Sequence, residues 1–282
     1  VVATELGLAL ATKGHMVHFI TYTQPVRLKA FRPGVFYHEV NPLKYDLFEY
    51  APYEIALASK LVDVCQYEKL DILHVHYAIP HASSAYLAKK ILDEKGISIP
   101  IITSLHGTDI TLVGKDDSYA PVVAFSINQS NGVTTVSQSL KEETLEQFDI
   151  KKEIEVIPNF IDFSRFKKSD KEHFKKAICP DGEKLIIHVS NFRSVKRIPD
   201  IIKVFKKVRE KMPVKMLLIG DGPERHNAES LCREINVFDD VRFLGKQNAI
   251  EELMAIGDAC LLYTSDAADE GLGVDLGGRR II

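Results

Sequence analysis

The chain has 282 residues, about the length of two ordinary domains. Its 36 lysines and arginines against 39 aspartates and glutamates give a net charge of −3, so no broad basic surface for nucleic acid is expected. No apolar run approaches the roughly 18 residues that span a bilayer, and the four cysteines are too scattered for a zinc site, so the composition favours a cytoplasmic two-domain α/β enzyme without nucleic-acid or membrane partners.

Predicted strands and helices alternate along the chain. Residues 1–10 have the apolar spacing of an amphipathic helix, and Gly14 lies where that helix would end. Short aliphatic and β-branched runs predict strands at Met16–Thr21, Phe36–Val40, Ile72–His76, Ile99–Leu105, Val133–Val136, Ile154–Ile157, Leu185–Val189, Lys215–Ile219 and Val241–Leu244. Helical patterns lie near 52–69, 81–95, 118–130, 138–148, 199–212, 223–235 and 247–256. This alternation predicts an α/β fold, with parallel sheets covered by helices on both faces.

The alternation is interrupted once, by a polar, lysine-rich segment at 162–181. This interruption predicts two domains, at 1–164 and 165–259. Two stretches beyond them, at 260–270 and 274–282, resemble a translated sequencing adapter. We therefore expect 260–282 to be a non-native tail without a packed core, rather than a natural glycine-rich loop.

Polar, glycine-rich and basic residues follow the ends of several predicted strands. His106-Gly107-Thr108-Asp109 follows one strand and Asn159 follows another in the first domain. Arg193 and Lys196, and then Gly220-Asp221-Gly222, follow strands of the second domain. Ligands of parallel sheets bind beyond the carboxyl ends of the strands. The sequence therefore predicts a site for a polar, anionic ligand where two such edges face each other.

Each of these motifs also has a purely structural interpretation. His74 and His76 share one strand face, as metal ligands do, but without a third ligand at a telling distance a pair of hydrogen-bonded histidines is favoured. The segment 106–109 fits a turn in which Gly107 has a positive φ and Asp109 caps a short helix. The segment 220–223 fits a tight turn before a helix. Arg193 and Lys196 fit surface charge as well as diphosphate binding.

Seven segments taken together resemble the GT-B glycosyltransferases of family 4. They are HVHYAIPHA (74–82), SLHGTDIT (104–111), TTVSQSL (134–140), VIPNFID (156–162), VSNFRSVKRIPD (189–200), LLIGDGPE (217–224) and FLGKQ (243–247). The first, second and fifth are most similar to the bacterial branch that joins N-acetylglucosamine to L-malate at the start of bacillithiol synthesis. The resemblance covers residues 1–259. It implies two Rossmann-like, doubly wound domains facing a cleft, and an enzyme that uses a UDP-sugar.

The resemblance also implies roles for individual residues. Arg193 and Lys196 match the cations on the UDP diphosphate, so no metal or other cofactor is expected. Gly220, Asp221 and Gly222 match a donor-side loop, and His106 matches the catalytic histidine near the transferred sugar. The acceptor-side positions, where L-malate would bind, are Tyr77, Thr103 and Asn159. The family retains the anomeric configuration, through front-face attack in which the leaving phosphate helps to deprotonate the acceptor.

Two parts of the family pattern have no match in this sequence. The glycine-rich turn expected before the first helix and the glutamate-containing loop expected after residue 259 are absent. We therefore expect a first domain without its initial strand, a truncated second domain, and slow transfer by the chain as given. Two other functions stay open: a family 4 transferase for a cell-envelope or lipid-linked acceptor, and a non-catalytic nucleotide-sugar-binding module. Self-association into a homo-oligomer also stays open.

Overall fold

A computed structural model describes residues 2–25, 28, 31–43, 51–114, 116–162, 165–166, 172–247 and 249–261. Described residues up to Phe160 form one compact unit, and those from Ile161 onward form a second. The division lies close to the predicted boundary at residue 164. Residues 262–282, which make up most of the predicted tail at 260–282, lie outside the described residues. Each unit is considered by itself below.

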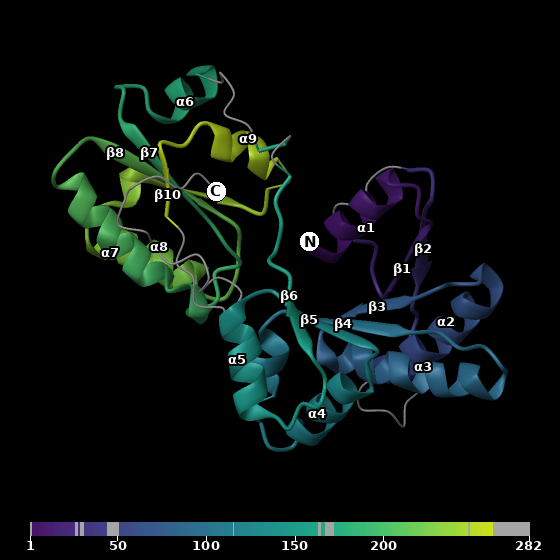
Figure 1. The fold of residues 1–282 in the computed structure, drawn as a ribbon. Helices are drawn as coiled ribbons and strands as arrows, with labels where there is room; N and C mark the ends of the chain where they lie inside the picture. Colours follow the sequence, from purple (N-terminus) through teal and green to yellow (C-terminus); the bar gives the residue numbers. More distant parts are fainter. Residues whose placement is uncertain are drawn as a thin grey trace. The chain divides into compact units, whose positions relative to one another are not determined.

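The first unit contains two parallel sheets (Figure 1). One pairs β1 (Val17–Thr21) with β2 (Val35–Glu39). The other has the order β3-β4-β5-β6, with strands at Leu73–His76, Ile101–Leu105, Gly132–Thr135 and Ile154–Val156. The helices are α1 (Val2–Thr12), α2 (Tyr53–Glu68), α3 (Ser83–Glu94), α4 (Ala120–Gln129) and α5 (Gln138–Gln147). Parallel pairing places the carboxyl ends of β3 to β6 at one edge.

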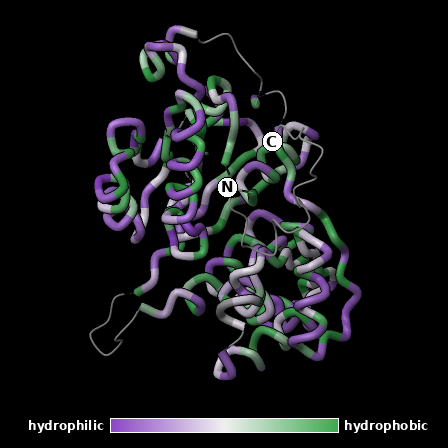
Figure 2. The backbone as a smooth tube through the Cα atoms, turned by 90° about the vertical axis from the view of Figure 1, so that its left-hand side faces the viewer, coloured by the Kyte–Doolittle hydropathy of each residue, from purple (hydrophilic) through white to green (hydrophobic). Residues whose placement is uncertain are grey.

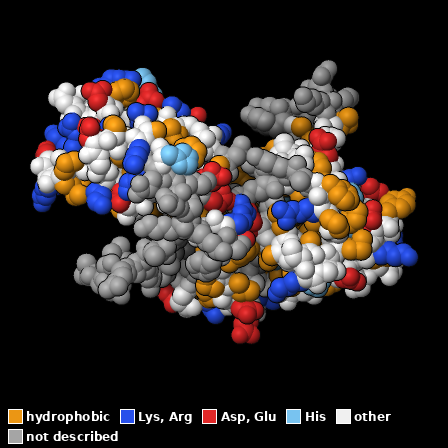
Figure 3. Space-filling view, turned by 90° about the horizontal axis from the view of Figure 1, so that it is seen from above, with side chains coloured by type: hydrophobic (Ala, Val, Ile, Leu, Met, Phe, Trp, Pro, Cys, Tyr) orange, Lys and Arg blue, Asp and Glu red, His pale blue; other side chains and the backbone are white. Residues whose placement is uncertain are grey.

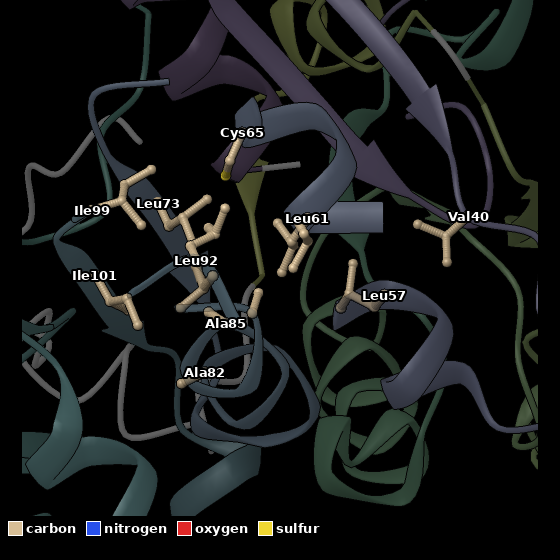
Figure 4. Close-up of a cluster of buried hydrophobic side chains, with 13 residues drawn as sticks. Val40, Leu57, Leu61, Cys65, Leu73, Ala82, Ala85, Leu92, Ile99 and Ile101 are labelled. Carbon is tan, nitrogen blue, oxygen red and sulfur yellow. The ribbon is translucent and has the colours of Figure 1, made fainter. Parts of the chain in front are cut away.

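The largest buried cluster of the first unit lies where α2 and α3 contact the sheet (Figure 4). Leu57, Leu61 and Cys65 recur every fourth residue, so they lie on one face of α2. The matching face of α3 contains Ala85 and Ala88, whose small side chains let two helices approach closely. This packing fixes β3 and β4, and with them the loops that follow both strands.

The second unit contains one parallel sheet in the order β10-β7-β8-β9. Its strands are β7 (Lys184–Val189), β8 (Val214–Ile219), β9 (Val241–Gly245) and β10 (Ala259–Cys260). Its helices are α6 (Glu172–Ile178), α7 (Ile198–Arg209), α8 (Arg225–Glu234) and α9 (Ile250–Ala255). Met216 and Leu218 of β8 belong to one buried cluster, and Leu217 and Ile219 belong to another. Because side chains alternate along a strand, this sheet is buried on both faces.

The predicted alternation of strands and helices is confirmed, and hydrophobic and hydrophilic stretches alternate along the described chain (Figure 2). Two of the differences from the prediction lie in the second unit. Helix α6 lies inside the polar segment where none was predicted, and β10 continues to Cys260, one residue into the predicted tail. None of the helices in the described ranges is both long and apolar enough to cross a membrane. On the face in Figure 3, lysines and arginines lie among aspartates and glutamates.

Candidate active site

The carboxyl ends of β3 and β4, with the loops that follow them, bring a tyrosine and two histidines together. The strands pair with His76 opposite Ser104, so Tyr77 and His106 leave the same edge side by side. The rings of Tyr77 and His106 are 5.1 Å apart, and His76 Nδ1 lies 2.8 Å from His106 Nε2. Tyr77 has a φ of 79°, and its backbone N–H donates to the Ser104 carbonyl at 2.9 Å. The first unit therefore places two of its predicted site residues in direct proximity.

Burial keeps the histidines of this loop pair uncharged. It lowers the pKa of His76 to about 3, with smaller effects from neighbouring imidazoles, and that of His106 to about 4. His74 Nε2 lies 2.9 Å from Ser104 Oγ, and burial lowers its pKa as well. His74 and His76 are thus hydrogen-bonded histidines, as the favoured interpretation predicts. At neutral pH each ring can donate from one nitrogen and accept at the other.

Asp109 fastens the two loops to each other. Its side chain is 2% exposed and accepts hydrogen bonds from Ala78 N at 2.9 Å and from His106 N at 3.4 Å. Gly107 has the predicted positive φ, 106°. Sequence reasoning identified the local turn but not the contact with Ala78, because 31 positions separate the two residues and no local pattern joins them. The position of His106 therefore depends on Asp109.

Thr103 and Asn159 have different surroundings from Tyr77. Thr103 is completely buried on β4, and its hydroxyl lies 2.7 Å from Ser130 Oγ in the interior of the unit. Asn159 is exposed on the loop after β6, which lies two strands away from β4. Their acceptor-side roles stay predictions.

In the second unit, the loop after β7 packs directly against the loop after β8. A Cβ atom at Gly220, which has a φ of 123°, would overlap the carbonyl oxygen of Ser190, and one at Gly222 would overlap that of Asn191. The backbone N–H of Glu224 donates to the Phe192 carbonyl at 2.9 Å. Glycine is required at 220 and 222 because the two backbones approach so closely.

The two residues predicted to bind the diphosphate come directly after this contact in the chain. Arg193 is exposed and precedes the short turn Ser194–Lys196, in which Lys196 N donates to the Arg193 carbonyl at 2.9 Å. Their turn and the glycine loop 220–222 therefore lie at the same edge of the second sheet. The single cleft predicted to include both edges joins residues of two units, and it stays a prediction.

His188 is a site-supporting residue that sequence reasoning missed. It is completely buried between the Leu261 carbonyl, 2.7 Å from Nδ1, and Ser190 Oγ, 2.8 Å from Nε2. Ser190 Oγ in turn accepts a hydrogen bond from Phe192 N at 3.3 Å. Burial lowers the pKa of His188, the hydrogen bond with the Leu261 carbonyl opposes this, and the positive charge of Lys196 lowers the pKa further. A lone histidine in an aliphatic strand carries no sequence signal for this role.

Comparisons with known proteins agree with this architecture. Residues 1–165 match the family described as Glycosyltransferase Family 4, and residues 169–276 match that described as Glycosyl transferases group 1. The chain is 48% identical over 265 residues to the N-acetyl-alpha-D-glucosaminyl L-malate synthase of Bacillus anthracis, which covers 94% of this chain and 69% of that enzyme. It is 30% identical to an uncharacterized glycosyltransferase of Methanocaldococcus jannaschii, covering 86% of this chain and 64% of that protein.

Solved structures give the same fold at low sequence identity. A Rickettsia africae glycosyltransferase superposes with a TM-score of 0.68 at 18% identity, covering 93% of this chain and 68% of that one. An Anabaena protein in complex with UDP and glucose superposes with a TM-score of 0.62 at 18% identity, covering 82% of this chain and 61% of that one. The GT-B fold class predicted from the sequence is confirmed. The chain belongs to glycosyltransferase family 4.

Proposed function

We propose that this protein transfers N-acetylglucosamine from UDP-N-acetylglucosamine to L-malate with retention of anomeric configuration. The observation that carries the proposal is the 48% identity to the Bacillus anthracis synthase over 94% of the chain. The UDP-containing Anabaena structure of the same fold supports a UDP-sugar as donor. Bacillithiol synthesis is the pathway in which such a product is used.

The second unit supplies the donor side in this proposal. Arg193 and Lys196 would bind the diphosphate, because guanidinium and ammonium groups form charge-assisted hydrogen bonds with phosphate oxygens. The loop at 220–222 lies beside them, because its two glycines let its backbone pack against residues 190 and 191. The two cations would also stabilise the negative charge that develops on the leaving UDP. This scheme requires no metal ion.

His106 would bind the transferred sugar as a neutral hydrogen-bond partner. Its Nε2 is engaged by His76 Nδ1 at 2.8 Å. When His76 donates this hydrogen bond, the single proton of His106 is on Nδ1 and can be donated to a sugar hydroxyl. The lowered pKa of His106 keeps it neutral across the physiological range. Tyr77, whose ring contacts that of His106, would lie on the acceptor side.

The proposed reaction exchanges one bond for another at the anomeric carbon. The hydroxyl oxygen of malate bonds to C1 of N-acetylglucosamine on the face from which the diphosphate leaves, and the bond from C1 to the β-phosphate oxygen breaks. The hydroxyl proton passes to the leaving phosphate, so UDP and the glycoside are the products. A protein carboxylate pair like that of glycosidases is not needed.

Product analysis tests the proposal directly. The chain is incubated with UDP-N-acetylglucosamine and L-malate, and N-acetylglucosaminyl malate is measured by mass spectrometry, which detects product even at slow turnover. We expect the product with L-malate and none with D-malate. Transfer to a lipid-linked or cell-envelope acceptor but not to malate would overturn the acceptor. Tight UDP binding without any transfer, in a chain extended to the full length of its relatives, would favour the non-catalytic alternative.

A further inference from the structure

Three side chains with metal-binding groups converge in the first unit, and none of them belongs to the proposed active site. His18 lies on β1, His38 on β2, and Glu68 is the last residue of α2. One ligand atom from each lies within 4.8 Å of the others. Among the described residues no other set of three histidine, cysteine or carboxylate side chains converges in this way.

The parallel pairing of β1 and β2 brings the two histidines together. His18 pairs with Phe36, and His38 is two residues further along the same strand, so both imidazoles lie on one face of this sheet. The ring of His18 stacks on Phe36 with centroids 4.6 Å apart. It is also nearly parallel to the ring of His38, at an interplanar angle of 12°. These contacts hold the two ligand nitrogens in place before any ion binds.

The distances suit one small cation. His18 Nδ1 and His38 Nε2 are 2.9 Å apart, and both rings are partly buried. Two nitrogens bound tetrahedrally to one zinc ion at roughly 2.0–2.1 Å are about 3.3 Å from each other. An increase of a few tenths of an ångström in the distance between the two nitrogens would therefore convert the hydrogen-bonded pair into a pair of ligands. Glu68 is exposed, so solvent can reach the position beyond its carboxylate.

The surrounding charges are compatible with a bound cation. Glu68 contributes a negative charge that acts on both His18 and His38. The charges of Lys60 and Asp63 also act on His38, and these two side chains form an ion pair of 3.2 Å with each other. Their effects on an ion beside His38 therefore oppose each other, and the charge of Glu68 decides the sign.

We propose that His18, His38 and Glu68 form a binding site for a divalent transition metal ion such as Zn²⁺. Two imidazoles and one carboxylate suit zinc, cobalt, nickel or copper, whereas Mg²⁺ and Ca²⁺ prefer oxygen ligands alone. The site shares no residue with the proposed donor and acceptor positions, so it does not depend on the proposed function. Water completes the coordination on the exposed side.

Cobalt binding tests this site, because four-coordinate Co²⁺ absorbs visible light strongly. The chain is titrated with Co²⁺, then with Zn²⁺ as competitor, and the stoichiometry and affinity are compared with those of H18Q, H38Q and E68Q. We expect one ion per chain. Each variant should bind the ion more weakly, by at least the roughly 10–100-fold that is typical of losing a group that only supports a ligand. His15 is an exposed histidine three residues before His18, and H15Q serves as the matched control.

The outcomes separate a built site from incidental binding. Loss of the cobalt spectrum in H18Q, H38Q and E68Q, with retention in H15Q, supports the site. E68Q changes only an exposed side chain, so its result stands even where a histidine variant fails to fold. Equal affinity in E68Q and H15Q, binding of several weak ions, or no binding at all overturns the proposal.

Discussion

At the scale of single residues, the contact between the His76 and His106 rings depends on one proton that lies between their nitrogens. The hydrogen bond between their ring nitrogens needs a donor on one side and a lone pair on the other. Charging both rings would place two N–H groups face to face in a partly buried position. Burial is the main cause of the lowered pKa values, about 3 for His76 and about 4 for His106, and the charge of His106 lowers the pKa of His76 further.

The first prediction concerns stability in acid. Between pH 6.5, the ordinary histidine value, and about 4, the unfolded chain binds protons that the folded His76 and His106 do not. The free energy of unfolding therefore falls as pH falls through this window, by up to about 1.4 kcal/mol per pH unit for each such proton. Urea unfolding from pH 7.5 to 4.5 should show a shallower decline for His76→Gln. His173→Gln, at an exposed histidine, should keep the full slope, and equal slopes in the two variants would contradict the assignment.

The second prediction concerns the close contact at Gly220. Gly220→Ala should lower the free energy of unfolding by at least about 2 kcal/mol more than Gly182→Ala, because only at 220 does the new methyl group overlap a carbonyl. Gly182 is the matched control, since its φ of 80° is also positive but nothing lies within 4 Å of an added Cβ. Denaturant titration measures both variants. A Gly220→Ala protein as stable as Gly182→Ala would show that the loops separate at little cost.

At the scale of elements, the site in the first unit depends on a link between two loops. β3 and β4 are adjacent, but neighbouring strands alone do not determine the path of the loops that follow them. Asp109 connects these paths, since its two carboxylate oxygens accept from backbone groups of both loops. Burial raises the pKa of Asp109, while the same backbone hydrogen bonds oppose this rise.

The third prediction concerns this link. Asp109→Asn replaces one accepting oxygen by an NH₂ group that faces a backbone N–H, so the free energy of unfolding should fall by about 1–3 kcal/mol. Asp117→Asn, at an exposed aspartate on the following turn, should change it by less than about 0.5 kcal/mol. Chemical denaturation measures both. Equal stabilities of the two variants would show that Asp109 does not hold the loops.

The elements themselves follow closely from the sequence, whereas contacts between distant elements do not. The mostly apolar run at 215–219 predicts β8, because successive residues of a strand that is buried on both faces are apolar. Helix α6 is not predicted, because it is short and lies in a charged segment. Its Lys175 forms an ion pair of 2.6 Å with Asp258. Asp109 and Ala78, like His18 and Glu68, meet only through the fold. Local periodicity contains no information on such pairs.

At the scale of the whole molecule, the two units have separate buried clusters. The first unit buries apolar residues on α2 and α3 and beneath β4 and β5, and the second does so on the two faces of β8. A ligand that binds one unit should therefore stabilise that unit first. The proposed UDP contacts all lie in the second unit.

The fourth prediction follows from this division. UDP at about 100 times its Kd should stabilise the folded second unit by about 2.7 kcal/mol. Hydrogen exchange should slow most around 190–196 and 220–222. Lys196→Ala should weaken UDP binding by more than about tenfold, whereas Lys207→Ala, on the exposed side of α7, should leave it unchanged. Protection confined to the first unit, or equal binding by the two variants, would refute the donor assignment.

The parallel order of every described sheet has a consequence for how this scaffold can change. Tyr77, His106, Arg193 and Gly220 each lie in a loop after a strand, whereas most residues of the buried clusters lie on strands and helices. The positions proposed to contact substrate therefore overlap only in part with the positions on which folding stability depends. If the proposed acceptor side is right, exchanging the less buried positions of the loops at 77–82 and 106–111 between relatives should alter the acceptor, provided that the buried Ala78, Ala82, Asp109 and Ile110 are kept.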